Sequence, residues 1–189
     1  MNEPKKNGKA QKTREHLLRT SLKLMEKNGY QNTTVRDICA EANVSIGTFY
    51  SYFPSKNDLF LDIYGEADDY FTDTVSVNIT GHTAKEKIID FFRFYARLNI
   101  DSGIELVRIL YNPDNSWFSR TRPMQQVLEK IVSDGMASGE LEGDISPSEA
   151  VDFFFISVRG FCYNWCILNG EYDLEAELVK FVTRVLRAF

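Results

Sequence analysis

Apolar residues recur along most of the chain with the three-to-four-residue spacing of amphipathic helices. Between residues 13 and 28 the stripe includes Leu17, Leu24 and Met25, and Asn28-Gly29 ends it because glycine readily takes the left-handed C-cap conformation. Strand-type alternation is nowhere sustained. The pattern therefore predicts an all-α fold of about nine helices. The further helices are expected at residues 35–43, 46–53, 55–77, 83–101, 103–111, 122–138, 147–169 and 173–188.

Two short helices with a tight turn between them follow the first helix. Asn43 tolerates the left-handed turn conformation, and Ser45 is expected to cap the helix that begins at Ile46. Phe49 and Phe53 lie four residues apart and face inward, which leaves the other residues of this helix on the outside. Such a pair is typical of a helix-turn-helix, whose second helix fits the major groove of DNA.

Charge is distributed unevenly. The 189 residues carry a formal charge of -5, yet residues 1–60 hold 10 basic and 6 acidic side chains, and residues 61–189 hold 12 and 21. A basic N-terminal segment on an acidic body indicates that the first part alone meets a nucleic acid. The Lys-rich stretch 1–12 is predicted to be a disordered tail.

Composition excludes several other classes. Hydrophobic residues make up 43% and charged residues 26%, which is too apolar for a disordered chain. No h-region follows the basic N-terminus, and the apolar stretches are shorter than a membrane span. Three cysteines without framework spacing fit a reducing compartment. We therefore expect a soluble, cytoplasmic protein with no membrane partner.

The string TTVRDICAEANVSIGTFYSYFPSKNDLF at 33–60 resembles closely the DNA-binding region of the TetR/AcrR family of transcriptional regulators. Cys39 stands where the family usually has Ala, and Asn43 where it often has Gly. The resemblance covers residues 13–65, and beyond it only GELEGDISPSEA at 139–150 looks similar. It implies a helix-turn-helix domain over 13–54, a connecting helix over 55–77, and a ligand-binding and dimerisation domain over 78–189. The matching parts are Thr34, Ile38, Val44-Ser45, Gly47 to Tyr50, Phe53, Lys56, and Leu59-Phe60.

The resemblance also implies roles at the matching positions. Thr34 would contact phosphate at the start of the second helix, and Lys56 would hold a phosphate from the start of the fourth. Thr48 and the backbone at Gly47, after the cap Ser45, would approach base edges. The remaining outward residues would grip phosphates or thymine methyls, although the tyrosines among them could instead pack in a small core: Tyr50, Ser51 and Tyr52.

The last two predicted helices carry more apolar surface than one core needs. The stripe over 173–188 is continuous, and the helix over 147–169 is apolar on most sides, so it has to be buried on more than one side. In a chain of this length, the economical expectation is that one side faces its own core and another faces a second subunit. The family's two C-terminal helices likewise pair across a homodimer. The residues predicted at this interface are Phe154, Phe161, Trp165, Leu178, Phe181, Val182 and Val185.

Aromatic side chains gather in the middle helices, where family members enclose a small-molecule inducer. Aromatic residues at helical spacing are also ordinary core, so both interpretations stay open. Arg159 interrupts an apolar run and could meet a ligand anion or pair with Asp152. The candidate ligand contacts are Phe92, Tyr95, Asn99, Arg108, Trp117, Phe155, Arg159 and Tyr163.

Little else in the sequence carries chemistry. Cys162 and Cys166 lie four residues apart, where a redox pair or a soft-metal site is conceivable, although buried thiols are commoner in an apolar helix and no histidine lies nearby. No catalytic grouping emerges, so we expect no enzyme, no metal and no cofactor. The leading hypothesis is a homodimeric repressor, released from a pseudo-palindromic double-stranded DNA operator by an unidentified small apolar or aromatic effector. The alternative is a ligand-binding or protein-interaction bundle that does not bind DNA.

Overall fold

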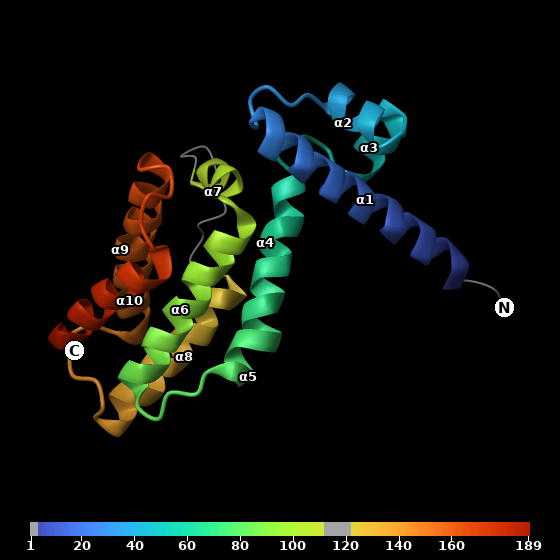
Figure 1. Cartoon of the computed structure of the whole chain (residues 1–189). Coiled ribbons are helices and arrows are strands. Elements are labelled where there is room, and N and C mark those ends of the chain that lie inside the picture. Colours follow the sequence, from blue (N-terminus) through green and yellow to red (C-terminus); the bar gives the residue numbers. More distant parts are fainter. Residues whose placement is uncertain (1–3, 112–121) are drawn as a thin grey trace. The chain divides into compact units, whose positions relative to one another are not determined.

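The computed structural model describes residues 4–111 and 122–189, and every regular element in these ranges is a helix. The predicted all-α fold is therefore confirmed. The chain divides into two compact units, Met1–Tyr64 and Gly65–Phe189. Figure 1 labels the helices in chain order, with the first unit running from blue to cyan.

The first unit is built from α1, α2, α3 and the start of α4. Both predicted left-handed positions are present, since φ is 80° at Gly29 after α1 and 53° at Asn43 between α2 and α3. Thr34 forms a capping box with Asp37 at the start of α2. The bounds are Pro4–Asn28 for α1, Val35–Glu41 for α2, Ile46–Tyr52 for α3 and Leu59–Asp69 for α4.

The inward faces of these helices form the core of the first unit. Leu17, Ile38, Phe49 and Leu59 each have no exposed surface, and Phe53 is 1% exposed. The rings of Phe49 and Phe53, which the sequence predicts to face inward, have centroids 5.6 Å apart. Burying a side chain of this size contributes roughly 1.5–3 kcal/mol. The two rings therefore fix the rotation of α3 about its axis.

Two boundaries in this part of the chain differ from the prediction. α1 begins at Pro4, whereas the sequence predicts a disordered tail over residues 1–12; proline suits a first helical turn, and the Lys, Ala and Gln residues that follow favour a helix. The helix predicted from residue 55 begins only at Leu59, because Ser55 and Asp58 hydrogen-bond to each other in a turn after Pro54. After α4 the chain continues as a π-helix, η1 (Tyr70–Val75), and α5 (Ser76–Asn78).

The second unit is a bundle of longer helices around an aromatic core. α6 packs against α8 and α10, and α9 packs against α7, α8 and α10. The starts of α6 and α9 have capping boxes, formed by Thr83 and Ser146, and α8 ends at a left-handed Gly139. The bounds are Ala84–Ser102 for α6, Ile104–Leu110 for α7, Pro123–Ser138 for α8, Pro147–Ile167 for α9 and Leu174–Val185 for α10, with a 3-10 turn η2 at Leu186–Ala188.

None of the helices in the described ranges is both long and apolar enough to cross a membrane.

Candidate functional site

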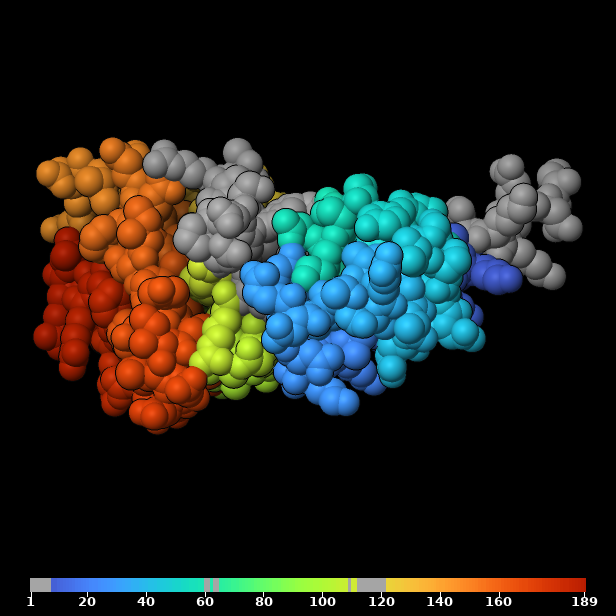
Figure 2. All heavy atoms as spheres, turned by 90° about the horizontal axis from the view of Figure 1, so that it is seen from above, coloured from blue at the N-terminus to red at the C-terminus, as the bar shows by residue number. Residues whose placement is uncertain are grey.

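The outer side of α3 is the candidate nucleic-acid interface. Ser45 caps this helix by accepting a hydrogen bond from the Thr48 backbone N–H at 3.0 Å, and the two hydroxyl oxygens lie 2.8 Å apart. Because Phe49 and Phe53 anchor the inner side, the opposite side of α3 is exposed. Residues of α2 and α3, in light blue and cyan, form much of the surface of the first unit in Figure 2.

Two apolar side chains are unusually exposed on α3. Ile46 is 44% exposed and Tyr50 is 51% exposed, in a helix of only seven residues. Tyr50 touches the edge of the Phe49 ring, with centroids 5.5 Å apart, but it does not join the core. The alternative of a packed Tyr50 is therefore wrong. The sequence interpretation missed Ile46, although its place as the first residue of the outward-facing helix was the available signal.

The small residues of α3 leave its backbone accessible. Gly47 is exposed, and a Cβ atom built there would have only the Ser45 hydroxyl oxygen near it, at 3.7 Å. Ser51 is exposed, and its hydroxyl donates to the Thr48 carbonyl at 2.6 Å. A partner can thus approach α3 closely between Ile46 and Tyr50.

Thr34 caps the N-terminus of α2. Its hydroxyl lies 2.6 Å from an Asp37 carboxylate oxygen, to which it donates, and its backbone N–H donates to the same oxygen at 2.9 Å. These hydrogen bonds lower the pKa of Asp37. The hydroxyl proton is thus already used, and the predicted phosphate contact of Thr34 stays a prediction. Arg36, exposed on α2, is a cation on this helix that the sequence interpretation did not single out.

Lys56 occupies a different place from the predicted one. It lies in the turn before α4 and is half-buried, not on the first turn of the helix. Its ammonium group donates to the carbonyls of Tyr30 at 2.7 Å and Thr33 at 2.8 Å, and lies 3.9 Å from the centroid of the Tyr30 ring. Burial lowers the pKa of Lys56. Lys56 therefore fastens the α1–α2 turn in this structure, and its predicted phosphate contact stays a prediction.

Tyr52 is half-buried and lies beside α1. It lines a hollow together with Gly8, Ala10, Gln11 and Arg14. Arg14 pairs with Asp62 at 2.5 Å and lies over the Phe53 ring at 5.3 Å. The end of α3 is thus held against α1, and Tyr52 is less available to DNA than Tyr50.

Comparison with known proteins agrees with this geometry. The family described as "Bacterial regulatory proteins, tetR family" matches residues 17–63. The fatty acid metabolism regulator protein of Bacillus subtilis is 24% identical over 168 residues, covering 85% of this chain and 87% of that protein. Residues 17–63 are therefore a tetR-family helix-turn-helix DNA-binding domain.

Solved structures of tetR-family regulators have the same fold. The crystal structure of FadR from Bacillus subtilis in complex with stearoyl-CoA has a TM-score of 0.75 and 23% identity, covering 91% of this chain and 96% of that one. Thermus thermophilus FadR in complex with lauroyl-CoA has a TM-score of 0.72 and 24% identity, covering 92% and 93%. At these identities the likeness shows that this chain has the same fold, and nothing more.

The second unit packs several predicted ligand contacts into its core. Phe92 has no exposed surface, Phe155 is 1% exposed, and their ring centroids are 5.8 Å apart. Tyr95 packs on both rings, and Asn99 donates to the Tyr95 carbonyl at 2.7 Å. For Phe92 and Phe155 the alternative of ordinary core packing is the one the structure favours.

The other predicted ligand contacts are spread over the second unit. Arg108 donates to the Cys166 carbonyl at 2.9 Å and pairs with Glu105 at 2.6 Å, so it fastens α7 to the end of α9. The Arg159 guanidinium lies 5.1 Å from the centroid of the Phe155 ring. Tyr163 is 54% exposed and belongs to the surface. Trp117 lies outside the described residues.

A short chain of polar groups runs through the aromatic core. The hydroxyls of Tyr95 and Tyr111 lie 2.9 Å apart, and burial raises the pKa of Tyr95 to about 12. Burial likewise raises the pKa of Cys162 to about 12, although a hydrogen bond with Tyr111 opposes the shift. Cys166 is buried as well. Because thiolates are the reactive form, the redox interpretation of this cysteine pair has no support. Among the described residues no cluster of potential metal ligands occurs.

The residues predicted at the dimer interface do not form the exposed apolar face of α9. Phe154, Trp165, Leu178 and Val182 are at most 7% exposed within a single chain, so they belong to its own core. Phe161, Phe181 and Val185 are partly buried against that core. The apolar surface left on α9 is the opposite face, and α9, in orange, lies at the surface of the second unit in Figure 2. This face consists of Phe153 (49% exposed), Ile156 (69%), Gly160, Tyr163 (54%) and Ile167 (58%).

The hydrophobic pattern marks both faces of α9 and cannot tell them apart. Phe153 and Phe154 are neighbours of the same residue type, yet one is half exposed and the other buried. The positions of α7, α8 and α10, which pack against α9, decide between them.

Proposed function

We propose that this tetR-family regulator is a homodimeric repressor that binds a pseudo-palindromic operator through α3 and leaves it when an acyl-chain effector occupies the second unit. One observation carries the DNA-binding part: the outward side of α3 combines exposed Ile46 and Tyr50 with an accessible backbone at Gly47, on a helix that buried phenylalanines hold in place. As a regulator of transcription it would act in the cytoplasm, where bacterial DNA is found.

The chemistry of this surface fits the major groove. Ile46 and the ring of Tyr50 provide apolar contact for thymine methyl groups, and the hydroxyls of Thr48 and Ser51 can exchange hydrogen bonds with base edges or phosphates. The excess of basic residues over 1–60 provides the long-range attraction, which weakens as salt rises. The acidic remainder of the chain disfavours docking by any other surface.

Binding to the DNA upstream of the protein's own gene tests this part of the proposal. Fluorescence anisotropy over a salt series should give a Kd that rises steeply with salt. Tyr50→Ala should raise the Kd about 5- to 150-fold, as expected for the loss of ~1–3 kcal/mol at a base-reading contact. Thr183→Ala, at an exposed threonine of α10, is the matched control and should leave the Kd unchanged. Equal affinities of all three proteins would refute the assignment of α3.

The exposed face of α9 supports the dimer. Large apolar residues at helical spacing seldom remain exposed unless they meet a partner. Gly160 lies near the middle of this face, and a Cβ atom built there has nothing within 4 Å in the single chain. A second copy of α9 can therefore approach closely at Gly160. A two-fold dimer would place two α3 helices on half-sites about 34–36 Å apart.

The effector class is inferred from the solved relatives that hold stearoyl-CoA and lauroyl-CoA. A long acyl chain needs an apolar cavity, which an all-helical unit rich in aromatic residues can supply. Release follows if the effector binds more tightly to the conformation that fits DNA poorly. Adding palmitoyl-CoA to the protein–operator complex should raise the apparent Kd for DNA, whereas free CoA should not. Unchanged DNA binding at saturating palmitoyl-CoA would contradict the effector class.

A further inference from the structure

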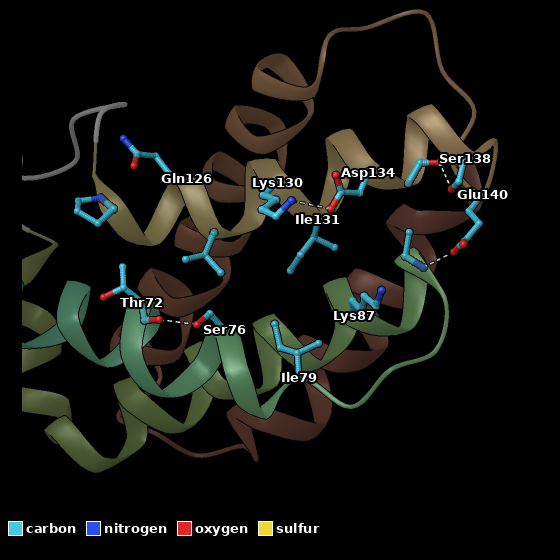
Figure 3. Close-up of a pocket in the computed structure, with 14 residues that line it drawn as sticks. Thr72, Ser76, Ile79, Lys87, Gln126, Lys130, Ile131, Asp134, Ser138 and Glu140 are labelled. Atoms are coloured by element: carbon cyan, nitrogen blue, oxygen red, sulfur yellow. Dashed lines mark hydrogen bonds and ion pairs between the residues drawn. The ribbon is translucent and has the colours of Figure 1, made fainter.

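The second unit contains a cavity that is lined by none of the predicted ligand contacts within the described residues. Its volume is about 640 Å³. η1 and α5 form one side of the cavity, α8 forms the other side, and the start of α6 also lines it (Figure 3). All of its lining residues belong to the second unit. The cavity opens to solvent along one side, so a ligand can enter without unfolding a helix.

Contacts at both ends of α8 hold the cavity open. At the N-terminal end, Asp68 pairs with Arg122 at 3.1 Å and accepts a hydrogen bond from the Met124 backbone N–H at 3.2 Å. Beyond the C-terminal end, the Glu140 carboxylate accepts a hydrogen bond from the Ala84 N–H at the start of α6. The helices also meet tightly at Gly135, where an added Cβ atom would be 2.5 Å from the Ala84 Cβ atom. The space between these two fixed ends is therefore a built feature of the bundle.

The wall opposite α8 has an unusual backbone. Thr72 and Ser76, which line the cavity, lie in η1 and at the start of α5, and the Ser76 hydroxyl donates to the Thr72 carbonyl. A π-helix is rare, and where it occurs it is frequently at a functional site. The wider turn changes which side chains face α8 at this level of the helix.

The lining is apolar at its centre and has Lys87 beside this apolar part. Ile79 and Ile131 face each other across the space, with Lys87 beside them (Figure 3), and Val127 extends the apolar wall along α8. Lys87 is half-buried and forms no ion pair with any residue in the described part of the chain. Lys130, by contrast, already pairs with Asp134 at 3.1 Å.

The two acidic side chains that line the cavity also have partners already. Asp134 faces Lys130, and Glu140 holds the Ala84 N–H. Lys87 is therefore the charge that remains to attract a ligand, and that ligand should be an anion. Because Ile79, Val127 and Ile131 line the adjoining space, the same ligand should carry an apolar chain.

We propose that this cavity binds an amphipathic organic anion, with its charged head at Lys87 and its hydrocarbon chain between Ile79 and the α8 wall. This inference assigns a binding site and a head-group chemistry to the proposed effector. It rests on the proposed function only for the claim that binding releases DNA. Carboxylate and phosphate heads share this chemistry, and both accept hydrogen bonds from an ammonium group.

Calorimetry on the full chain without DNA tests the site with decanoate, decyl phosphate and decan-1-ol as probes. Decanoate or decyl phosphate should bind more tightly than decan-1-ol, and Lys87→Gln should weaken binding of the tighter anion ~10-fold or more, as loss of a charge-assisted hydrogen bond implies. The preferred anion identifies the head group. Lys85→Gln is the matched control, because Lys85 is on the same helix but does not line the cavity.

A second variant tests the apolar part. Val127→Trp should fill the space and abolish binding of both anions and of decan-1-ol, while circular dichroism confirms that the helices remain. Wild-type affinity for the anions in either Lys87→Gln or Val127→Trp would overturn the proposal. Because calorimetry needs no DNA, a chain that binds decanoate but no operator would refute the proposed function and leave this site standing.

Discussion

Gly47→Ala should strengthen the fold and weaken DNA binding at the same time. Gly47 is the second residue of α3, and a Cβ atom there meets only the Ser45 hydroxyl at 3.7 Å, an ordinary contact. Alanine is favoured over glycine in a helix by roughly 0.5–1 kcal/mol, and nothing in the structure opposes that gain. For a chain of this length, such a gain raises Tm by ~1–4 °C.

DNA should respond in the opposite direction. If bases or phosphates approach the α3 backbone between Ile46 and Tyr50, a methyl group at residue 47 intrudes into that contact. Overfilling a packed interface costs about 1–3 kcal/mol, which corresponds to a Kd raised about 5- to 150-fold. Thermal unfolding measures the first effect, and anisotropy with operator DNA measures the second.

Gly65→Ala provides the matched control. Gly65 lies within α4, and a Cβ atom built there has nothing within 4 Å. The control should gain similar stability and bind DNA as the wild type does. An unchanged Kd for Gly47→Ala would refute the approach of DNA to this backbone. A lower Tm would refute the assignment of unstrained helical geometry to residue 47.

Three further predictions test other parts of the chain. Lys56→Ala should destabilise the first unit by roughly 1–3 kcal/mol in urea unfolding, because it breaks two charge-assisted hydrogen bonds; unchanged stability with a salt slope reduced by ~1 would instead restore the phosphate role. Ile156→Asp should convert a dimer to monomers in sedimentation experiments, whereas Lys180→Asp on α10 should not. The depressed pKa of Asp37 gives stability that is present above its usual pKa near 3.8 and lost as pH falls through the lower folded value. In acid titrations Asp37→Asn should remove that part of the pH dependence, and a wild-type profile in this variant would contradict the capping role.

The local signals in the sequence predict the first unit well because they act over a few residues. Caps and turns need particular residues whatever surrounds them, and the structure has Thr34, Asn43 and Ser45 in those roles. The inward direction of Phe49 and Phe53 follows from helical spacing alone. The exposed state of Tyr50 follows in turn, because the two phenylalanines already occupy the inner side of α3.

Local spacing does not predict which groups a long side chain contacts. The family resemblance places Lys56 on the first turn of a helix, but the helix begins three residues later and the flexible side chain reaches back to carbonyls 23 and 26 residues earlier. Neither fact is visible in local spacing. The π-helix over Tyr70–Val75 is similar, since no residue pattern distinguishes it from the α-helix predicted over 55–77.

The connecting segment ties the proposed effector site to the DNA-binding unit through the chain itself. Leu59, at the start of α4, has no exposed surface in the core of the first unit, and Thr72, in η1, lines the cavity of the second. No loop separates them, because α4 passes directly into η1. Under the proposed function, a ligand that favours one geometry of η1 would act on the helix that completes the core beneath α3. A 100-fold loss of operator affinity requires that the ligand bind the released conformation ~100-fold better, a difference of about 2.7 kcal/mol. One charge-assisted hydrogen bond at Lys87, made in only one conformation, contributes a free energy of that order.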